Sequence, residues 1–250
     1  MSAFDLNAYL ARIGWQGSLE PTLDTLAGLT RAHITRIPFE NVDVLLGRGG
    51  YCFEHGTLFQ AVLEAVGFRP VAHAARVVVI VPRHQSPRTH MFLTVDIEGE
   101  RFMVDPGFGG HTTLLPVPLR DGAEVRDGSD RHRMVRHEGE WVLEAEIDGT
   151  MTALWTATLE PQLPIDFQLA NHWVSTAPAS PFVNRLMLRA LTPGGRTSVM
   201  NRDVTVSSAG KTEKYQLADR KALRALLGEH FGFDLPDVEQ LRVPMVPEWS

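Results

Sequence analysis

An antiparallel sheet is predicted most directly by residues 89–105, THMFLTVDIEGERFMVD. Two strand-like runs there flank a Glu98-Gly99 dipeptide, which suits a two-residue hairpin turn. The first candidate strand extends from Thr89 to Ile97 and the second from Glu100 to Asp105. In such a hairpin Ile97 pairs with Glu100, and this pair fixes the register of the rest of the hairpin.

The register has a consequence for two polar residues, His90 and Asp105. His90 is expected opposite Gly107, and Asp105, two residues earlier, is then its diagonal neighbour on the same face. A three-residue loop would put the two side chains on opposite faces. With the shorter turn, Asp105 can accept a hydrogen bond from one imidazole nitrogen and hold the other nitrogen toward a third group.

The chain has one cysteine, Cys52, and it stands where a helical pattern begins. Gly67 closes this pattern as a C-terminal cap would, after apolar residues at helical spacing, Leu58, Ala61, Val62, Ala65 and Val66. A thiol attacks acyl groups as the thiolate, which a helix N-terminus or a neighbouring imidazole favours. We therefore predict that Cys52 is a nucleophile, with His90 as its base and Asp105 as the group that orients the base.

The remaining pattern divides the chain into three predicted domains: residues 1–68, helical and carrying the nucleophile; 69–170, an antiparallel sheet or barrel carrying the histidine and the aspartate; and 171–250, mixed. Predicted helices lie around residues 6–13, around 23–30 behind Glu20-Pro21, and from about Asp219. Predicted strands include the apolar run Val77 to Val81, a hairpin at Asp148-Gly149, and strands at 186–191 and 198–206 turned by Pro193-Gly194-Gly195.

Composition favours a soluble, cytoplasmic enzyme. The 250 residues are 44% hydrophobic, enough for a substantial core, and the formal charge of −6 without a dense basic block disfavours nucleic acid as a partner. One cysteine allows no internal disulfide, and no stretch approaches the length of a membrane span. The first five residues have neither a basic nor an apolar run, so no secretory signal and no membrane association are expected.

Several longer blocks resemble the arylamine N-acetyltransferase family. They are Ile37-Pro38-Phe39-Glu40-Asn41-Val42-Asp43-Val44-Leu45-Leu46-Gly47-Arg48, Arg48-Gly49-Gly50-Tyr51-Cys52-Phe53-Glu54-His55, Pro87-Arg88-Thr89-His90-Met91 and Val104-Asp105-Pro106-Gly107-Phe108-Gly109-Gly110. Further matches at Asp166-Phe167, Ala170-Asn171-His172 and Ser180-Pro181-Phe182 extend the resemblance over most of the chain.

The resemblance implies an α+β fold: an N-terminal helical bundle, a central antiparallel β-barrel and a C-terminal α/β lid around a cysteine-protease-like catalytic core. It also implies acetyl transfer from acetyl-CoA to Cys52 and then to an arylamine, arylhydrazine or related amine, a ping-pong sequence associated with xenobiotic metabolism. Cys52, His90 and Asp105 take the positions of the catalytic triad. No metal is expected.

The same resemblance implies substrate contacts. Four aromatic residues become candidates for the acceptor pocket, namely Phe39, Tyr51, Phe108 and Phe182, and Thr89 and Gly109 become candidates for contact with CoA. Each aromatic residue taken singly is more often a core residue. Phe108 is the best of them, because flanking glycines and the strand end beyond Pro106 favour a ring that faces a cleft.

The chain departs from the family pattern just before the cysteine. A helical segment normally separates two of the blocks that are here fused through Arg48, so this segment is expected to be missing. Its loss would leave apolar surface on the helical bundle that another segment or a second subunit, as in a homodimer, must cover. Pro106 is a second departure, and it removes a backbone donor beside Asp105.

Other functions remain open at this stage. The same Cys-His-Asp chemistry serves a cysteine hydrolase or an amide synthase, and a relative impaired by the missing segment would act only as a scaffold or dimer partner. His55, three residues after Cys52, invites a zinc interpretation, which the absence of a second close Cys/His pair disfavours.

Overall fold

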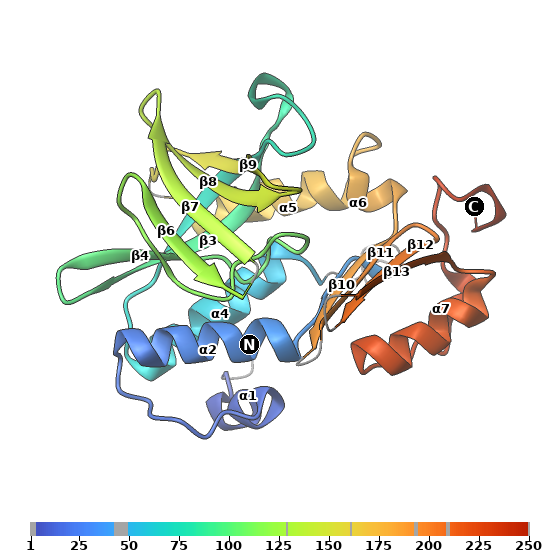
Figure 1. Cartoon of the computed structure of the whole chain (residues 1–250), viewed down its shortest axis with the longest axis horizontal. Coiled ribbons are helices and arrows are strands. Elements are labelled where there is room, and N and C mark those ends of the chain that lie inside the picture. The colour runs from blue at the N-terminus through green and yellow to red at the C-terminus, as the bar shows by residue number, and fades with distance from the viewer. Residues whose placement is uncertain are drawn as a thin grey trace. The chain divides into compact units, whose positions relative to one another are not determined.

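The computed structural model describes residues 4–42, 50–128, 130–160, 162–192, 195–208 and 211–249. It is a mixed helix-and-sheet protein, as predicted (Figure 1). The chain divides into two compact units. The first unit comprises Met1–His33 and Cys52–Ala170, and the second comprises Ile34–Tyr51 and Asn171–Ser250.

The predicted N-terminal helices are present. They are α1 (Leu6–Ile13), α2 (Leu23–Arg36) and α4 (Cys52–Val66). In α1 the Asp5 carboxylate caps the first turn by accepting from the Ala8 N–H, and Gly14 ends the helix at φ 67°. Gly67 ends α4 in the same way at φ 107°, as the sequence predicts. Cys52 is therefore the first residue of its helix.

Within the described residues, the first unit contains an eight-stranded antiparallel sheet in the order β5-β4-β3-β2-β9-β8-β7-β6. Its strands are β2 (Val71–Val77), β3 (Arg88–Ile97), β4 (Glu100–Val104), β5 (Val117–Pro118), β6 (Ala123–Asp127), β7 (Asp130–His137), β8 (Glu140–Ile147) and β9 (Thr150–Ala157); a 3-10 turn, Arg83–Gln85, precedes β3. The edge strands β5 and β6 lie next to each other, so the sheet curls into a nearly closed barrel (Figure 1).

Both predicted hairpins are confirmed. Ile97 pairs with Glu100 across Glu98-Gly99, whose φ angles of 52° and 86° are those of a two-residue turn with both residues left-handed. Asp148-Gly149 repeats this geometry between β8 and β9. Glu138-Gly139, at 49° and 84°, makes a third such turn between β7 and β8, which the sequence analysis did not single out.

The prediction of a strand over Val77 to Val81 is wrong. The strand is β2, which ends at Val77, and Ile80 is 69% exposed. The N–H groups of Val78 and Val79 both donate to the Leu154 carbonyl, so the ladder breaks as the chain leaves the sheet. Past the break Val79 still packs against the barrel core, whereas Ile80 and Val81 are exposed.

The barrel interior is apolar and closely packed. Its core cluster draws on most strands of the sheet, with Ala75, Phe92, Met103, Val117, Met134, Leu143, Ala145, Leu154, Trp155 and Ala157 buried. The Trp155 ring of β9 stacks on Phe92 of β3, with centroids 4.4 Å apart and planes 22° apart. Such packing fixes the positions of neighbouring side chains on these strands.

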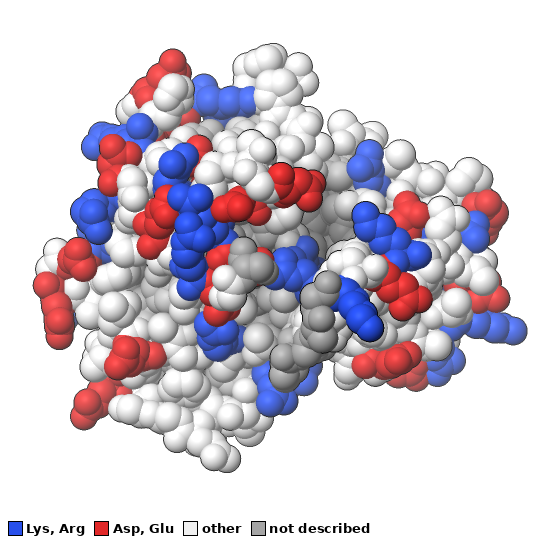
Figure 2. Space-filling model, viewed as in Figure 1, with Lys and Arg blue, Asp and Glu red and all other residues white. Residues whose placement is uncertain are grey.

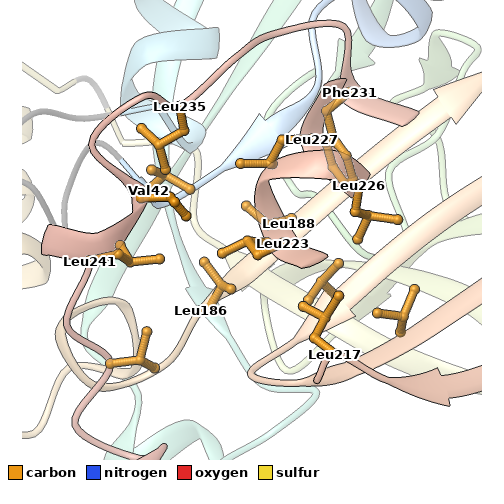
Figure 3. Packing of buried hydrophobic residues seen from close by; sticks show 14 of the residues in the cluster. Val42, Leu186, Leu188, Leu217, Leu223, Leu226, Leu227, Phe231, Leu235 and Leu241 are labelled. Carbon is orange, nitrogen blue, oxygen red and sulfur yellow. The ribbon is translucent and has the colours of Figure 1, made fainter. Parts of the chain in front are cut away.

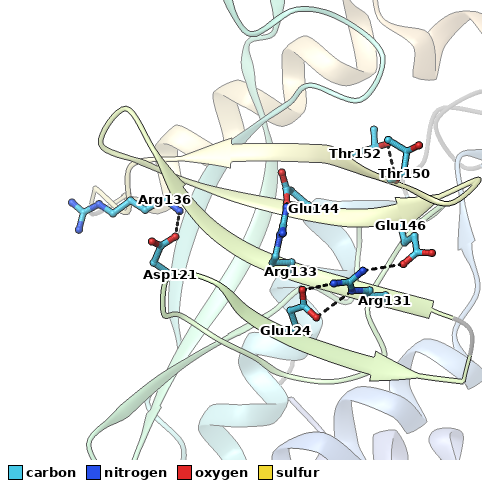
Figure 4. Close-up of polar contacts among 9 residues, drawn as sticks. All are labelled: Asp121, Glu124, Arg131, Arg133, Arg136, Glu144, Glu146, Thr150 and Thr152. Carbon is cyan, nitrogen blue, oxygen red and sulfur yellow. Dashed lines mark hydrogen bonds and ion pairs between the residues drawn. The ribbon is translucent and has the colours of Figure 1, made fainter.

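The exterior of β6 to β8 carries cross-strand charge pairs (Figure 4). The Arg131 guanidinium lies between the carboxylates of Glu124 and Glu146, and Arg133 pairs with Glu144. Figure 2 shows basic and acidic side chains interspersed on this face rather than gathered by sign. Alternating signs across neighbouring strands support the register without creating a strongly basic surface.

The second unit has its own sheet, in the order β1-β10-β11-β12-β13. Its strands are β1 (Phe39–Glu40), β10 (Met187–Thr192), β11 (Gly195–Met200), β12 (Asp203–Ser208) and β13 (Lys211–Gln216). Helices α6 (Pro181–Asn184) and α7 (Arg220–Leu226), a π-helical turn (Leu227–Phe231) and 3-10 turns at Val238–Gln240 and Pro247–Trp249 complete it. Leucines of α7 pack with Leu186 and Leu188 in one apolar cluster (Figure 3).

Two expectations for this region need correction. The predicted strand over residues 198–206 is two strands, β11 and β12, because Asn201 adopts φ 58° and turns the chain at Asn201-Arg202. Helix α5 (Pro164–Thr176) was not predicted. The turn residues Pro193 and Gly194 lie outside the described residues. The described helices include none that is both long enough and apolar enough to cross a membrane.

Candidate active site

Cys52 occupies the first turn of α4, where backbone N–H groups lack partners within the helix. Its side chain is buried, with 4% of the residue exposed. The Sγ atom lies 3.7 Å from the backbone carbonyl of Thr89 on β3. The cysteine thus faces the strand that carries His90.

His90 and Asp105 form a buried hydrogen bond. The imidazole Nε2 lies 2.8 Å from Asp105 Oδ2, and the two residues are 3% and 0% exposed. The Cys52 side chain lies close enough to the His90 imidazole to contribute to the raised pKa of His90. The structure therefore brings together the three residues that the sequence pattern selects.

The route to this pairing differs in detail from the predicted one. The β3–β4 ladder ends at Leu93 and Val104, so His90 has no ladder partner at Gly107 and instead pairs with Ala75 of β2. Pro106 has no N–H to extend the ladder, which explains the early end. Asp105 leaves the strand and still reaches the imidazole.

The electrostatics of His90 reflect this setting. Burial by itself would lower its pKa, but the charge of Asp105 and hydrogen bonds with Asp105 and Cys52 outweigh burial and raise the pKa above the ordinary value. An imidazole of raised pKa stays protonated at neutral pH. A cation held in contact with a thiol favours the thiolate.

The loop after β4 closes tightly on the cysteine. A Cβ atom on Gly107 would lie 2.6 Å from the Cys52 Cα and 3.2 Å from its Cβ. Only glycine permits this approach without displacement of backbone. Gly107 is thus a site residue through its lack of a side chain, whereas the sequence predicted it only as the register partner of His90 and as a residue flanking Phe108.

Two further contacts hold Asp105. The Trp155 indole Nε1–H donates to Asp105 Oδ2 over 2.9 Å, and the Thr112 hydroxyl donates to the Asp105 backbone carbonyl over 2.6 Å. Sequence reasoning missed both residues. Trp155 and Asp105 are 50 residues apart, so no local periodicity links them. A tryptophan in an apolar strand indicates only that its N–H needs some hydrogen-bonding partner.

Comparison with known proteins adds an independent observation. The N-acetyltransferase family model matches residues 46–240. An arylamine N-acetyltransferase of Mycobacterium bovis is 37% identical, and the match covers 94% of this chain and 92% of that protein. The chain belongs to the arylamine N-acetyltransferase family.

Solved structures agree with this assignment. The Mycobacterium tuberculosis arylamine N-acetyltransferase superposes with a TM-score of 0.87 at 37% identity, covering 94% of this chain and 96% of that one. The Mycobacterium marinum enzyme in complex with CoA gives 0.87 at 33% identity, covering 94% of each chain. Membership in the arylamine N-acetyltransferase family makes this protein an acyltransferase.

The predicted contact residues fall into two groups. In the first unit, Phe108 packs edge-on against His90 with ring centroids 5.2 Å apart, Gly109 is buried at φ 79°, and Thr89 is half-buried beside Cys52. Phe108 and Thr89 thus adjoin the Cys-His pair, and the roles of all three residues in binding substrate or CoA stay predictions.

The other aromatic residues form a cluster within the second unit. Phe182 packs against Tyr51, with centroids 4.8 Å apart, and against Phe39, with centroids 6.3 Å apart. The Tyr51 hydroxyl donates to the Asn171 side chain. Their role in arylamine binding stays a prediction.

His55 belongs to a buried hydrogen-bonded chain. Tyr9 Oη lies 2.8 Å from His33 Nδ1, and His33 Nε2 lies 2.9 Å from His55 Nδ1. Burial, then the charge of His55, lowers the pKa of His33 well below the usual value, so His33 is held neutral in this chain, which links α1, α2 and α4. The described residues contain no group of three or more His, Cys, Asp or Glu side chains that could hold a metal ion.

The segment in which this chain departs from the arylamine N-acetyltransferase pattern lies mostly at residues 43–49, outside the described residues. The expected absence of a helix there, and the homodimer that would cover the exposed surface, both stay predictions.

Proposed function

We propose that this protein transfers an acetyl group from acetyl-CoA to an arylamine, arylhydrazine or related amine through an acetyl-cysteine at Cys52. The observation that carries the proposal is the buried contact of Cys52 with His90, which is itself hydrogen-bonded to Asp105. The CoA complex of the Mycobacterium marinum relative supports a CoA thioester as the donor.

In the first half-reaction, the Cys52 thiolate attacks the thioester carbonyl carbon. Backbone N–H groups in the first turn of α4 are suitably placed to stabilise the resulting oxyanion. The new S–C bond forms as the C–S bond to CoA breaks, and the His90 imidazolium gives its proton to the departing CoA sulfur.

In the second half-reaction, the neutral amine attacks the acetyl-cysteine carbonyl. His90, now neutral, accepts a proton from the amine nitrogen, and the S–C bond breaks to release the amide and regenerate the thiolate–imidazolium pair. Asp105 keeps the imidazole oriented through both steps. Donor and acceptor react in turn, which is a ping-pong mechanism.

The site contacts follow from the same proposal. Phe108 would contact the acceptor amine together with Phe39, Tyr51 and Phe182, and Thr89 and Gly109 would contact CoA. The division into a helical bundle (1–68), a barrel (69–170) and an α/β lid (171–250), the cysteine-protease-like core, the cytoplasmic location and the role in xenobiotic metabolism belong to the proposal too.

Intact-protein mass spectrometry tests the nucleophile. After exposure to acetyl-CoA we expect the wild-type mass to increase by one acetyl group, and subsequent addition of an arylamine to remove it. Cys52→Ala and Cys52→Ser should show no acetylation, and Ser207→Ala, at a half-buried position on β12 of the second unit, should behave as wild type.

A parallel measurement of CoA release, with and without amine, separates related chemistries. CoA release that proceeds equally without amine would indicate a hydrolase, and acylation only by other thioesters would indicate an amide synthase. Full transfer activity in either Cys52 variant, or a wild-type protein that is never acylated, would refute the proposal.

A further inference from the structure

We propose that Trp155 is a positioning residue for acetyl transfer, whose indole N–H holds the Asp105 carboxylate in the orientation that His90 requires. The proposal rests on the catalytic role proposed for Cys52, His90 and Asp105. It assigns a function to a residue 50 positions away from the aspartate in the sequence.

The hydrogen bonds at Asp105 converge on one oxygen. Oδ2 accepts from Trp155 Nε1 at 2.9 Å and contacts His90 Nε2 at 2.8 Å. Oδ1 is buried and has no hydrogen-bonding partner among the described residues. In that part of the chain, the indole is thus the only donor besides His90 that the structure records for this carboxylate.

The indole donor is fixed in place. Trp155 is fully buried, and its ring stacks on Phe92, which lies two residues after His90 on β3. Its backbone pairs with Val77 of β2 on one side and Leu143 of β8 on the other. The donor therefore needs no reordering during the reaction, as a preorganised supporting contact should not.

The chemistry of the donor suits the task. An indole N–H donates and never accepts, and it does not titrate, so it offers the carboxylate a single arrangement at every working pH. A donor aimed at a buried anion also favours negative charge in the site. Asp105 and Cys52 are the two charged groups that act on the His90 ring. A displaced carboxylate would therefore stabilise the imidazolium less, and the thiolate beside it would form less readily.

A buried tryptophan also needs a partner merely to be satisfied, and the two roles predict different outcomes. If Trp155 only fills space, removal of its N–H will reduce stability and leave the reactivity of Cys52 unchanged. If it positions Asp105, removal of the N–H will shift the pH dependence of Cys52 reactivity to higher pH.

The test uses the single cysteine as its own reporter. The rate of Cys52 alkylation by iodoacetamide is measured from pH 4 to 10 in wild type, Trp155→Phe and Trp141→Phe. In Trp155→Phe we expect the midpoint of the rate profile to rise by about one pH unit, because a shift of this size corresponds to the loss of one hydrogen bond to a charged group. The matched control is Trp141 of β8, which is half-buried beneath the Arg136 guanidinium. Trp141→Phe should leave the profile unchanged.

A thermodynamic cycle adds a second criterion. If the indole acts through the carboxylate, Trp155→Phe should shift the profile in the wild-type background and cause no further shift in the Asp105→Asn background. Acetyl transfer by Trp155→Phe should show a kcat/KM about tenfold lower, with the loss in the acylation step.

If Trp155→Phe does not fold, 3-benzothienylalanine at position 155 keeps the bicyclic shape without the N–H, and the same shift is expected. An unchanged profile in either folded variant would overturn the proposal. Alkylation uses no substrate, so it reports on positioning even if acetyl-CoA never acylates Cys52, which would refute the proposed function alone.

Discussion

Two buried histidines, His90 and His73, show that the group in contact with an imidazole determines whether it is protonated. His90 and His73 are both buried, at 3% exposure each. His90 contacts a carboxylate, and its pKa is raised. His73 contacts the Thr94 hydroxyl at 2.9 Å and the face of Phe92; burial, then the charge of Arg101, lowers its pKa to about 4. The same desolvation thus yields a cation in one place and a neutral ring in the other.

His73 makes the stability of the fold depend on pH. Its pKa in the folded state is about 4, below the ordinary 6.5, so the unfolded chain binds a proton between these values that the folded chain does not. Stability is therefore unaffected by His73 above pH 6.5 and falls as the pH decreases toward 4. Allowing for partial solvent screening, we expect a loss of about 2 kcal/mol over this window.

His73→Gln removes the titration and keeps a side-chain hydrogen-bonding group near Thr94. Urea unfolding at a series of pH values should show a smaller loss of stability between pH 6.5 and 4 in this variant than in wild type. His137→Gln is the control, because the His137 side chain is 75% exposed. Parallel pH profiles for wild type and His73→Gln would contradict the assignment.

At the scale of elements, predictions succeeded where a short signal has a local cause. Glu98-Gly99 and Asp148-Gly149 adopt left-handed turns that glycine favours, and α4 is bounded by Cys52 and Gly67. Predictions failed for elements whose apolar residues do not mark a buried face. Helix α5 was missed, since Ile165 and Leu169 are 61% and 72% exposed and do not mark a buried face.

The site was predictable to the same extent. The hairpin register is local, so it could place His90 near Asp105 from sequence alone. The hydrogen bond from Trp155 depends on the pairing of β9 with β2, which are far apart in the sequence, and the close approach of Gly107 depends on the loop after β4. Neither of these two tertiary contacts produces a periodic pattern in the sequence, so neither could be predicted from it.

The loop after β4 should be intolerant of any side chain at Gly107. In Gly107→Ala the new Cβ would overlap the Cys52 backbone, so either the loop or the start of α4 must shift. We expect acetyl transfer to fall at least tenfold, because a displacement of about 1 Å can cost two orders of magnitude in rate. Gly228→Ala is the control, since nothing lies within 4 Å of its added Cβ. Equal kcat/KM values for the two variants would show that the approach is not needed.

For the whole molecule, the described apolar residues form separate interiors. Among the described residues, one cluster fills the barrel of the first unit, and a separate one lies between the five-stranded sheet and α7 in the second (Figure 3). Buried apolar residues of α1, α2 and α4, such as Leu29 and Phe59, belong to neither cluster. Each unit thus has a core of its own, which is the physical requirement for separate stability. Stability need not be uniform along such a chain.

This organisation makes a prediction for core truncation. Leu186 is fully buried in the cluster of the second unit, and Leu186→Ala should destabilise that unit by about 2–5 kcal/mol through lost burial and a residual cavity. Hydrogen exchange should therefore accelerate in β10 to β13 far more than in β7 to β9. Met200→Ala, at a side chain 41% exposed on the same sheet, should have little effect. Uniform acceleration through both units would instead mean that the two cores open as one cooperative structure.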